Sequence, residues 1–401
     1  MITGANFKNK GAQSMLFVAV DEIKRRYPDA QIFFGGIEKW KKGVYSFDQV
    51  FYRDYTKAIA MGSWQGLNRC VKTFTKDVIK TIAHKGTGLT HLFDLKKIIR
   101  SIDLILDISG FNIGRQWAAD TQEDYFDNIR LAKTFQIPMV LMPQSFGPFN
   151  YDADRRFLLD EAAALLPYPR LIFAREIESR RALEETFGLD NIELSADMVL
   201  QNKEIDLRNI FVCPPEIRIP TVLPDAVGIV PNAKCAAHGN EQEIMHLYSI
   251  IIHLLAENGK NVYIFNHSSG DRKLCTAIYE NNKSCGNVQL ITEDFNCFEY
   301  SEFIRQFDFI ICSRYHGIVN AYRNNTPSII LGWAEKYAEL AQLVGQKQFQ
   351  FDITDTIPSD EILHAVEKMA RDFDKERVII RERMKEIQEH NCFDRVWEQL
   401  K

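Results

Sequence analysis

The chain has 401 residues, of which 46% are hydrophobic and 26% are charged. This composition is typical of a globular protein, and the length exceeds what one ordinary hydrophobic core organises. No apolar run approaches the roughly 20 residues of a membrane-spanning helix, and the polar start of the chain lacks the features of a signal peptide. We therefore expect a cytoplasmic protein of two domains.

Eight cysteines are spread between positions 70 and 392 without a Cys-x-x-Cys pair, so neither a metal site nor a disulfide framework is expected. The net charge is −5, but residues 1–100 carry +10 and the remainder carries −15. The basic part is either an ordinary solvated surface or a face that meets an anionic lipid headgroup or a diphosphate. No motif for nucleic acid accompanies it, and no feature of the sequence indicates an oligomeric state.

Short apolar runs alternate with stretches of helical periodicity, which is typical of βαβ units and parallel sheets. In the first half, strands are predicted at residues 2–6, 31–35, 103–108, 138–142, 171–174 and 192–195. Helices are predicted between them, for example at residues 11–27, 124–135 and 176–187. Residues 1–205 are therefore expected to form a first Rossmann-like domain.

Four prolines between residues 214 and 224 interrupt the alternation, so residues 206–224 are expected to be a linker. A second series follows, with strands predicted at residues 226–230, 261–265, 288–291, 308–312 and 328–331 and a helix at 241–257. We expect a second Rossmann-like domain over residues 225–373 and a C-terminal helix over 374–401. The predicted fold class is α/β, with two doubly wound domains facing a cleft, where ligands bind at the carboxyl ends of the strands.

The clearest group of chemical side chains follows the apolar run 307–312, which is predicted to be a buried strand. Ser313, Arg314, Tyr315 and His316 lie at its carboxyl end and open a helix. Arg314 can bind a carboxylate or a phosphate with two hydrogen bonds, and His316 is suited to proton transfer near neutral pH. Arg175 similarly ends the strand 171–174, and Asp197 either supports Arg175 or caps a helix.

Other polar and glycine positions also follow predicted strands or open predicted helices. They are Asn9, Gly11, Gly110, Asn112, Gln144, Ser179, His267, Asp271 and Lys336. Asn9 and Gly11 resemble an anion cradle at a helix start. The alternatives are ordinary turn glycines, a helix cap by Asp271 and a surface position for Lys336.

Taken in order along the chain, these elements resemble the polysaccharide pyruvyltransferase family. The resemblance rests on Asn-x-Gly at 9–11, Asp-x-x-Gly at 107–110, Gln-Ser-x-Gly-Pro at 144–148, Arg-Glu-x-x-Ser at 175–179, His-x-x-x-Asp at 267–271 and Ser-Arg-Tyr-His at 313–316, with Asp197, Pro327 and Lys336. The last of these motifs is the most specific.

The resemblance implies a GT-B-like fold, phosphoenolpyruvate as the donor, no cofactor, and a pyruvate ketal on two hydroxyls of a sugar as the product. It implies an acceptor side in the first domain and a donor side in the second. His316 is then the expected acid or base, and its catalytic partners Arg314 and Arg175 are expected to hold the anionic groups of the donor. Ser313, Tyr315, Lys336 and Ser179 are expected on the donor side, and Asn9, Gly11, Gly110, Asn112, Gln144, His267 and Asp271 are acceptor or loop candidates.

Two alternatives stay open at this stage. A GT-B glycosyltransferase that uses a nucleotide sugar would have a similar architecture, and Glu335 is the nearest acidic residue for its donor ribose. A non-catalytic glycan-binding module would be expected to have lost the arginine and histidine group, which is intact here.

The basic residues of segment 69–100 predict peripheral binding to anionic membrane at its inner face, where polyprenyl-diphosphate-linked sugars are built. Eight Lys and Arg residues alternate there with apolar side chains, so one face can touch lipid while the other attracts headgroups. Liposome co-sedimentation should show binding that needs anionic lipid, weakens with salt, and is lost when Lys72, Lys76 and Lys80 become Glu. Equal recovery in the supernatant with anionic and neutral vesicles at low salt would contradict it.

Overall fold

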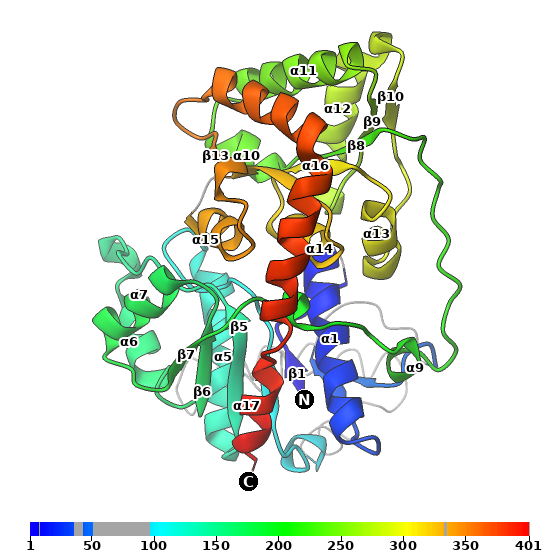
Figure 1. The fold of residues 1–401 in the computed structure, drawn as a ribbon. Coiled ribbons are helices and arrows are strands. Elements are labelled where there is room, and N and C mark those ends of the chain that lie inside the picture. Colours follow the sequence, from blue (N-terminus) through cyan, green and yellow to red (C-terminus); the bar gives the residue numbers. More distant parts are fainter. Residues whose placement is uncertain (8, 36–42, 51–96, 333–334, 401) are drawn as a thin grey trace, which may run out of the picture.

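The structure is a computed structural model that describes residues 1–7, 9–35, 43–50, 97–332 and 335–400. It contains two parallel sheets, each with helices on its faces (Figure 1). The first sheet has seven strands in the order β3-β2-β1-β4-β5-β6-β7, and the second has six in the order β10-β9-β8-β11-β12-β13. The predicted α/β class with two doubly wound sheets is confirmed.

The first sheet comprises β1 (Ile2–Thr3), β2 (Phe33–Gly35), β3 (Asp48–Val50), β4 (Ile105–Asp107), β5 (Met139–Gln144), β6 (Leu171–Ala174) and β7 (Ile192–Leu194). Helices in the same part of the chain are α1 (Lys10–Arg26), α5 (Ala119–Phe135), α6 (Phe157–Leu165), α7 (Ile177–Phe187), α8 (Met198–Gln201) and α9 (Leu207–Ile210). The order in which strands are added to the sheet changes at β1, because β2 and β3 lie on one side of it and β4 to β7 lie on the other. Ligands of such sheets bind beside this switch point.

The second sheet comprises β8 (Ala226–Val230), β9 (Asn261–Ile264), β10 (Val288–Leu290), β11 (Phe309–Cys312), β12 (Ser328–Gly332) and β13 (Gln350–Asp352). Its helices are α10 (Ala233–His238), α11 (Glu241–Glu257), α12 (Arg272–Asn282), α13 (Cys297–Ile304), α14 (Tyr315–Arg323), α15 (Glu335–Leu343) and α16 (Ser359–Ile387). Every residue of β8, β11 and β12 is buried, because helices cover both faces of this sheet. Its switch point lies at β8, between β9 and β11.

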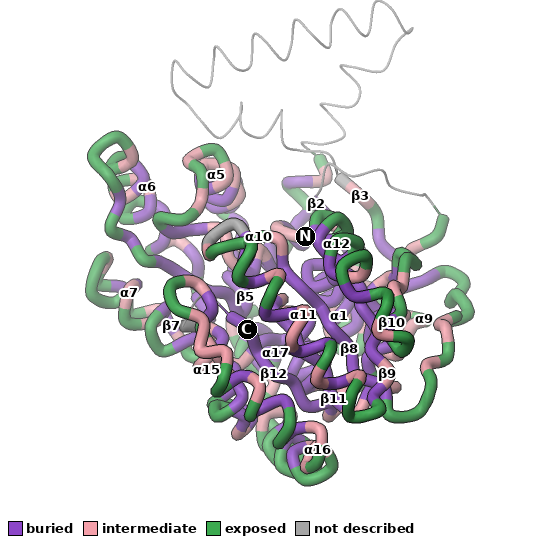
Figure 2. The backbone as a smooth tube through the Cα atoms, turned by 90° about the horizontal axis from the view of Figure 1, so that it is seen from above, coloured by how far each residue is buried: buried purple, intermediate pink, exposed green. Residues whose placement is uncertain are grey.

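One hydrophobic core extends across both sheets and joins them. It contains Val140 of the first sheet, Ile310 of the second and much of α1, which contacts α8, α13 and α14. Phe17 of α1 is 1% exposed, and its ring stacks on Phe298 of α13 with the centroids 5.2 Å apart. The buried residues therefore continue from one sheet to the other, as Figure 2 shows from above.

The C-terminal segment differs from the single helix predicted over residues 374–401. Helix α16 already begins at Ser359, and a separate helix, α17 (Cys392–Glu398), lies against β5 of the first sheet (Figure 1). Ile362 and Met369 of α16 pack in the core of the second domain, whereas Ile380 and Met384 reach the shared core. The predicted start was wrong because the apolar stripe continues through residue 374 without a glycine or proline to end it.

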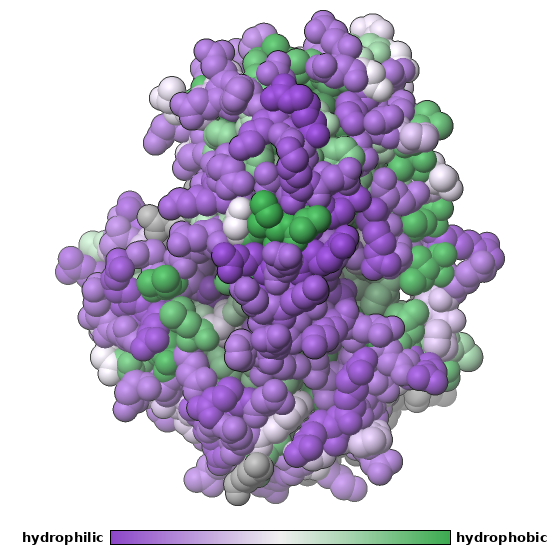
Figure 3. All heavy atoms as spheres, in the orientation of Figure 1, coloured by the Kyte–Doolittle hydropathy of each residue, from purple (hydrophilic) through white to green (hydrophobic). Residues whose placement is uncertain are grey.

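The face of the molecule seen in Figure 3 is mostly hydrophilic, with separate hydrophobic patches. Over the described ranges, no helix combines the length and the apolar character of a transmembrane span. Segment 69–100, for which membrane contact was predicted, lies outside the described residues except for 97–100.

The shared core predicts that the two domains unfold together. Phe17→Ala should lower the free energy of unfolding by roughly 3–5 kcal/mol, because it removes a ring that packs in the core shared by the two domains. Calorimetry should show one transition, moved as a whole to lower temperature. Phe157→Ala, at a residue that is 43% exposed, is the matched control and should move it little. Two separate transitions, only one of them shifted, would contradict the prediction.

Candidate functional site

A pocket of about 360 Å³ lies between the carboxyl edges of the two sheets. Its walls come from segments that follow six strands and from the start of α15, so residues far apart in the sequence meet there. Side chains from the first domain include Asn6, Asn9, Ser109, Phe111, Asn112, Gln116, Trp117 and Arg175, and those from the second include Asn232, Lys234, His267, Arg314, Tyr315, His316, Lys336 and Tyr337.

The structure brings nine of the fourteen sequence-predicted site residues into this lining. They are Asn9, Gly110, Asn112, Arg175, His267, Arg314, Tyr315, His316 and Lys336. The other five, Gly11, Gln144, Ser179, Asp271 and Ser313, lie behind the walls of the pocket. The strand-end positions that the sequence indicated therefore do meet, but not all of them face the same space.

Two of the residues behind the walls hold loops in place. The Ser313 side chain is fully buried, and its hydroxyl is 2.9 Å from the hydroxyl of Tyr248. The Ser179 hydroxyl accepts the N–H of Phe146 at 2.9 Å and donates to Glu176 at 2.8 Å. Both serines, expected on the donor side, thus make internal hydrogen bonds and lie away from the lining.

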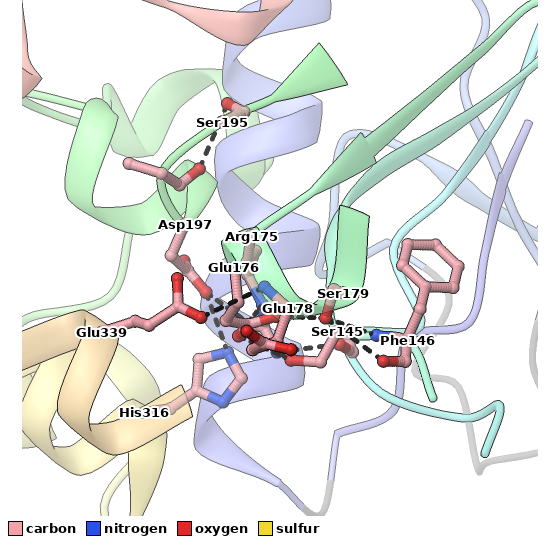
Figure 4. Close-up of polar contacts among 12 residues, drawn as sticks. Ser145, Phe146, Arg175, Glu176, Glu178, Ser179, Ser195, Asp197, His316 and Glu339 are labelled. Atoms are coloured by element: carbon pink, nitrogen blue, oxygen red, sulfur yellow. Dashed lines mark hydrogen bonds and ion pairs between the residues drawn. The ribbon is translucent and has the colours of Figure 1, made fainter. Parts of the chain in front are cut away.

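His316 is placed by a close contact between the domains. A Cβ atom added to Gly11 would lie only 2.2 Å from Cγ of His316, so only glycine allows α1 to approach the ring this closely. On its other side, Nε2 of His316 lies 3.6 Å from Oδ2 of Asp197 (Figure 4). Burial lowers the pKa of His316 to about 4, although Asp197 opposes the shift. The imidazole is therefore neutral at neutral pH.

Arg175 is held from three directions by groups of the first domain. Its guanidinium donates to Asp197, to the carbonyl of Gly110 and to the hydroxyl of Ser145, each at 2.8 Å. It also lies 4.6 Å from the ring centre of Tyr315, and its side chain is only 2% exposed. The arrangement fixes Arg175 rather than leaving it free to follow a ligand.

Asp197 fulfils both roles that the sequence left open. One carboxylate oxygen accepts Arg175 and faces His316, while the other caps α8 by accepting the N–H of Val199 at 2.9 Å. The carboxylate oxygen that accepts Arg175 of the first domain is thus the one that His316 of the second domain faces, without a hydrogen bond between them.

Arg314 and Asp271 form a two-point ion pair. Nε of Arg314 donates to one carboxylate oxygen at 2.7 Å, and Nη2 donates to the other. Asp271 also accepts the N–H groups of Ala233 at 3.0 Å and Ser268 at 3.3 Å, so the predicted helix-cap role is present beside the ion pair. The carboxylate lies behind Arg314, which itself faces the pocket.

Two lysines of the second domain lie over aromatic rings of the first. Lys336 is 4.5 Å from the ring centre of Phe111, and Lys234 is 4.6 Å from that of Trp117. The two rings meet edge to face, 5.7 Å apart. Aromatic rings attract a cation without neutralising its charge. Among the described residues, the lining contains four cationic side chains and no carboxylate, so it favours an anion.

Lys234, Phe111 and Trp117 were missed by the sequence analysis. Lys234 follows the carboxyl end of β8 by four residues, which is the kind of position that indicated Arg314 after β11. The sequence therefore does carry a signal for Lys234. The two aromatic residues carried no local signal, because only the approach of the second domain gives their rings a cationic partner.

The backbone N–H groups of the predicted anion cradle at the start of α1 already donate to a side chain of the protein. The side-chain oxygen of Asn9 accepts the N–H groups of Gly11 at 2.9 Å and Ala12 at 3.4 Å. The prediction was wrong because Asn9 is the N-cap of its own helix, which satisfies these donors internally.

Helix α7 receives its N-terminal cap from the other domain. Its own N-cap residue, Glu176, makes no such side-chain hydrogen bond. Instead, the carboxylate of Glu339 on α15 accepts the N–H groups of Ile177 at 2.7 Å and Glu178 at 3.3 Å (Figure 4). Glu339 follows Lys336 by three residues, and α7 starts two residues after Arg175. The cap therefore ties together two segments that carry pocket residues.

Comparison with known proteins gives a family and a fold. Residues 9–335 match the family model described as polysaccharide pyruvyl transferase. No curated protein matches the sequence. Among solved structures, HepE of Anabaena in complex with UDP is 12% identical, with a TM-score of 0.52 over 100% of this chain and 98% of the other.

Two further solved structures agree with this. The glycotransferase of kitacinnamycin is 11% identical, with a TM-score of 0.54 over 100% of this chain and 98% of the other. The UDP-GlcNAc 2-epimerase of Neisseria meningitidis, bound to UDP-GlcNAc, is 12% identical, with a TM-score of 0.51 over 94% and 93%. At these identities the likeness establishes the fold, which is the GT-B fold predicted from the sequence.

Lys336 should make anion binding depend on pH near neutrality. Burial lowers the pKa of its ammonium to about 7, and a bound anion raises that pKa because it favours the charged form. The affinity should be full below pH 7 and should fall as the pH rises towards the raised pKa, by roughly tenfold for each unit of the shift. Sulfate, a dianion throughout, is the probe, and calorimetry from about pH 6 to about pH 9 measures its affinity.

The matched variant is Lys336→Arg, which keeps its charge over this range and should bind sulfate with a flatter profile. His316, with a pKa of about 4, titrates below the window. The pKa of Lys234 is also lowered by burial, so Lys234→Ala is measured alongside. An unchanged pH slope in Lys336→Arg would show that another group is responsible.

Proposed function

The chain belongs to the polysaccharide pyruvyl transferase family, and from that premise we propose that it transfers the pyruvyl group of phosphoenolpyruvate to two hydroxyls of a sugar, forming a ketal. The observation that carries the proposal is the pocket lining, where four cations and no carboxylate among the described residues surround a neutral histidine. A small donor with a carboxylate and a phosphate suits such a lining.

The four cations are proposed to divide the work. Arg314, Lys234 and Lys336 face the pocket and are the proposed contacts of the donor's anionic groups. Arg175 is almost completely buried and already donates to three acceptors, so its proposed role is to position Asp197 and Tyr315. This differs from the direct contact with the donor that was expected from the sequence.

In the proposed reaction, every proton that a sugar hydroxyl loses is taken up by the terminal carbon or by the phosphate, so no acid or base is consumed. The first sugar hydroxyl adds to the central carbon of phosphoenolpyruvate, while the terminal methylene gains a proton and becomes a methyl group. The second hydroxyl then displaces phosphate from the same carbon, and its proton leaves with the phosphate. A neutral His316 can take the first hydroxyl proton and return it to the terminal carbon, which is the role we propose for it.

The proposed acceptor is a hexose of a lipid-linked or cell-surface glycan precursor, such as one carried on a polyprenyl diphosphate. Peripheral contact of segment 69–100 with an anionic membrane at its inner face would bring the enzyme to such an acceptor. This part of the proposal is independent of the reaction at the pocket.

One observation favours a second function, which is transfer from a nucleotide sugar. HepE and the epimerase share the GT-B fold and were solved with UDP or UDP-GlcNAc. The side chain of Glu335, the acidic candidate for a donor ribose, lies outside the described residues. The two functions differ in their donors, so a comparison of donors separates them.

Phosphoenolpyruvate should raise the melting temperature, because a ligand that binds only the native state stabilises it. With a suitable hexoside the protein should release inorganic phosphate from phosphoenolpyruvate. His316→Ala should lower this turnover roughly 10²–10⁴-fold while phosphoenolpyruvate still stabilises the variant. The measurements are thermal shift and phosphate release over a panel of lipid-linked and synthetic hexosides.

Stabilisation by UDP-sugars but not by phosphoenolpyruvate would replace the pyruvyl-transfer proposal by glycosyl transfer. Near-normal turnover of His316→Ala would remove His316 from the mechanism while leaving the donor assignment in place.

A further inference from the structure

We propose that three uncharged side chains of the pocket lining, His267, Ser109 and Asn6, form a subsite that binds the hydroxyl pair of the acceptor sugar. This inference rests on the proposed pyruvyl transfer and names where the sugar of its acceptor is held. Lys234, Lys336 and the aromatic rings of the same lining are left to the anionic donor.

The strongest observation is an unsatisfied histidine. His267 lines the pocket, is 2% exposed, and neither ring nitrogen has a hydrogen-bond partner among the described residues. Its ring stands edge to face on Tyr300, with the centroids 5.1 Å apart. Its backbone carbonyl accepts the ammonium of Lys10 at 3.0 Å, which ties the loop to α1. Buried polar groups without partners are rare in native proteins, so such a side chain points to a ligand or an ordered water.

The protonation state of His267 suits a hydroxyl. Burial, assisted by Lys10 and Arg314, lowers the pKa of His267 well below its usual value, so the ring is neutral. A neutral imidazole has one N–H donor and one acceptor nitrogen, which matches the two faces of an alcohol. It offers no charge to a phosphate.

Ser109 supplies a second unsatisfied group from the first domain. Its hydroxyl is buried and has no partner among the described residues, while its backbone N–H donates to Asp107 at 3.0 Å. A Cβ added to Gly4 would lie 2.3 Å from this hydroxyl, and Gly4 has a φ of +82°. Glycine at position 4 therefore leaves space beside the Ser109 hydroxyl. Asn6 lines the same pocket and adds an uncharged amide.

His316 is near both groups of residues. A charge on His316 would act on His267, and the charges of Arg175 and Lys336 act on His316. An acceptor held at His267 and Ser109 would thus be near the proposed proton carrier. A site built to hydrogen-bond a hydroxyl rejects analogues that lack it, because its own polar groups are then left unpaired.

The test compares variants of the proposed subsite with a variant of the lysine that is left to the donor. His267→Phe keeps a ring on Tyr300 but removes both nitrogens, and Ser109→Ala removes only the hydroxyl. Each should raise the KM for the hexoside acceptor roughly 10- to 100-fold, as expected for a lost hydrogen bond to a buried group. Stabilisation of these variants by phosphoenolpyruvate should be unchanged. Lys234→Ala should show the reverse pattern.

Monodeoxy hexosides distinguish a hydrogen bond from His267 to the acceptor from a purely structural role of His267. Removing the hydroxyl that His267 binds should raise the acceptor KM of wild type much more than that of His267→Phe. The hexoside and its monodeoxy analogue should therefore have similar KM values in the variant. Weaker phosphoenolpyruvate binding with an unchanged acceptor KM in both variants would overturn the subsite. An unchanged acceptor KM and an unaltered deoxy penalty would do the same.

Failure of the proposed function would look different. Wild-type protein would then show neither stabilisation by phosphoenolpyruvate nor release of phosphate from it. Direct calorimetry of hexosides, with wild type and Ser109→Ala, still tests the subsite in that case. Binding that is equal in both, or absent in wild type, would overturn it.

Discussion

One buried carboxylate, that of Asp197, connects the two halves of the pocket. A buried charge is tolerated only when it is paired and hydrogen-bonded, and Asp197 meets this condition through Arg175 at 2.8 Å. The same oxygen faces Nε2 of His316 at 3.6 Å, beyond hydrogen-bond distance, so the carboxylate that the first domain holds in place lies beside the histidine of the second. Arg175 is fixed by this group within the first domain, and Tyr315 and His316 of the second domain lie beside the resulting ion pair.

The pocket uses two different ways of holding a cation, and they have different consequences. Arg175 and Arg314 are fixed by Asp197 and Asp271, which partly neutralise them. The lysines lie over Trp117 and Phe111 instead, and these rings attract an ammonium group without neutralising it. The arginines therefore give the site its geometry, whereas the lysines give it most of its net attraction for anions.

The sequence predicted the parts of the site that depend on local position. Arg175, Arg314 and His316 were found because polar residues at the carboxyl ends of buried strands meet at one edge of a sheet. Lys336 was also placed correctly in the pocket. These are consequences of strand order and of helix starts, which periodicity reveals.

The features that were missed depend on contacts between distant segments. Gly11 was noticed as part of a motif, but its reason, the close approach of the His316 ring, exists only once the domains meet. The ring of Trp117 likewise has Lys234 over it only because the two domains meet. The strand β13 has three residues, too few for an alternating pattern to indicate it.

The cap that Glu339 provides for α7 has a consequence for motion. Any movement that separates α15 from α7 leaves the N–H groups of Ile177 and Glu178 without their carboxylate, at a cost of about 0.5–2 kcal/mol. Lys336 would leave with α15, and Arg175 would remain beside the frayed start of α7. Widening the entrance to the pocket is thus coupled to the fraying of a helix end, and re-forming that helix end brings the lysine back to the arginine.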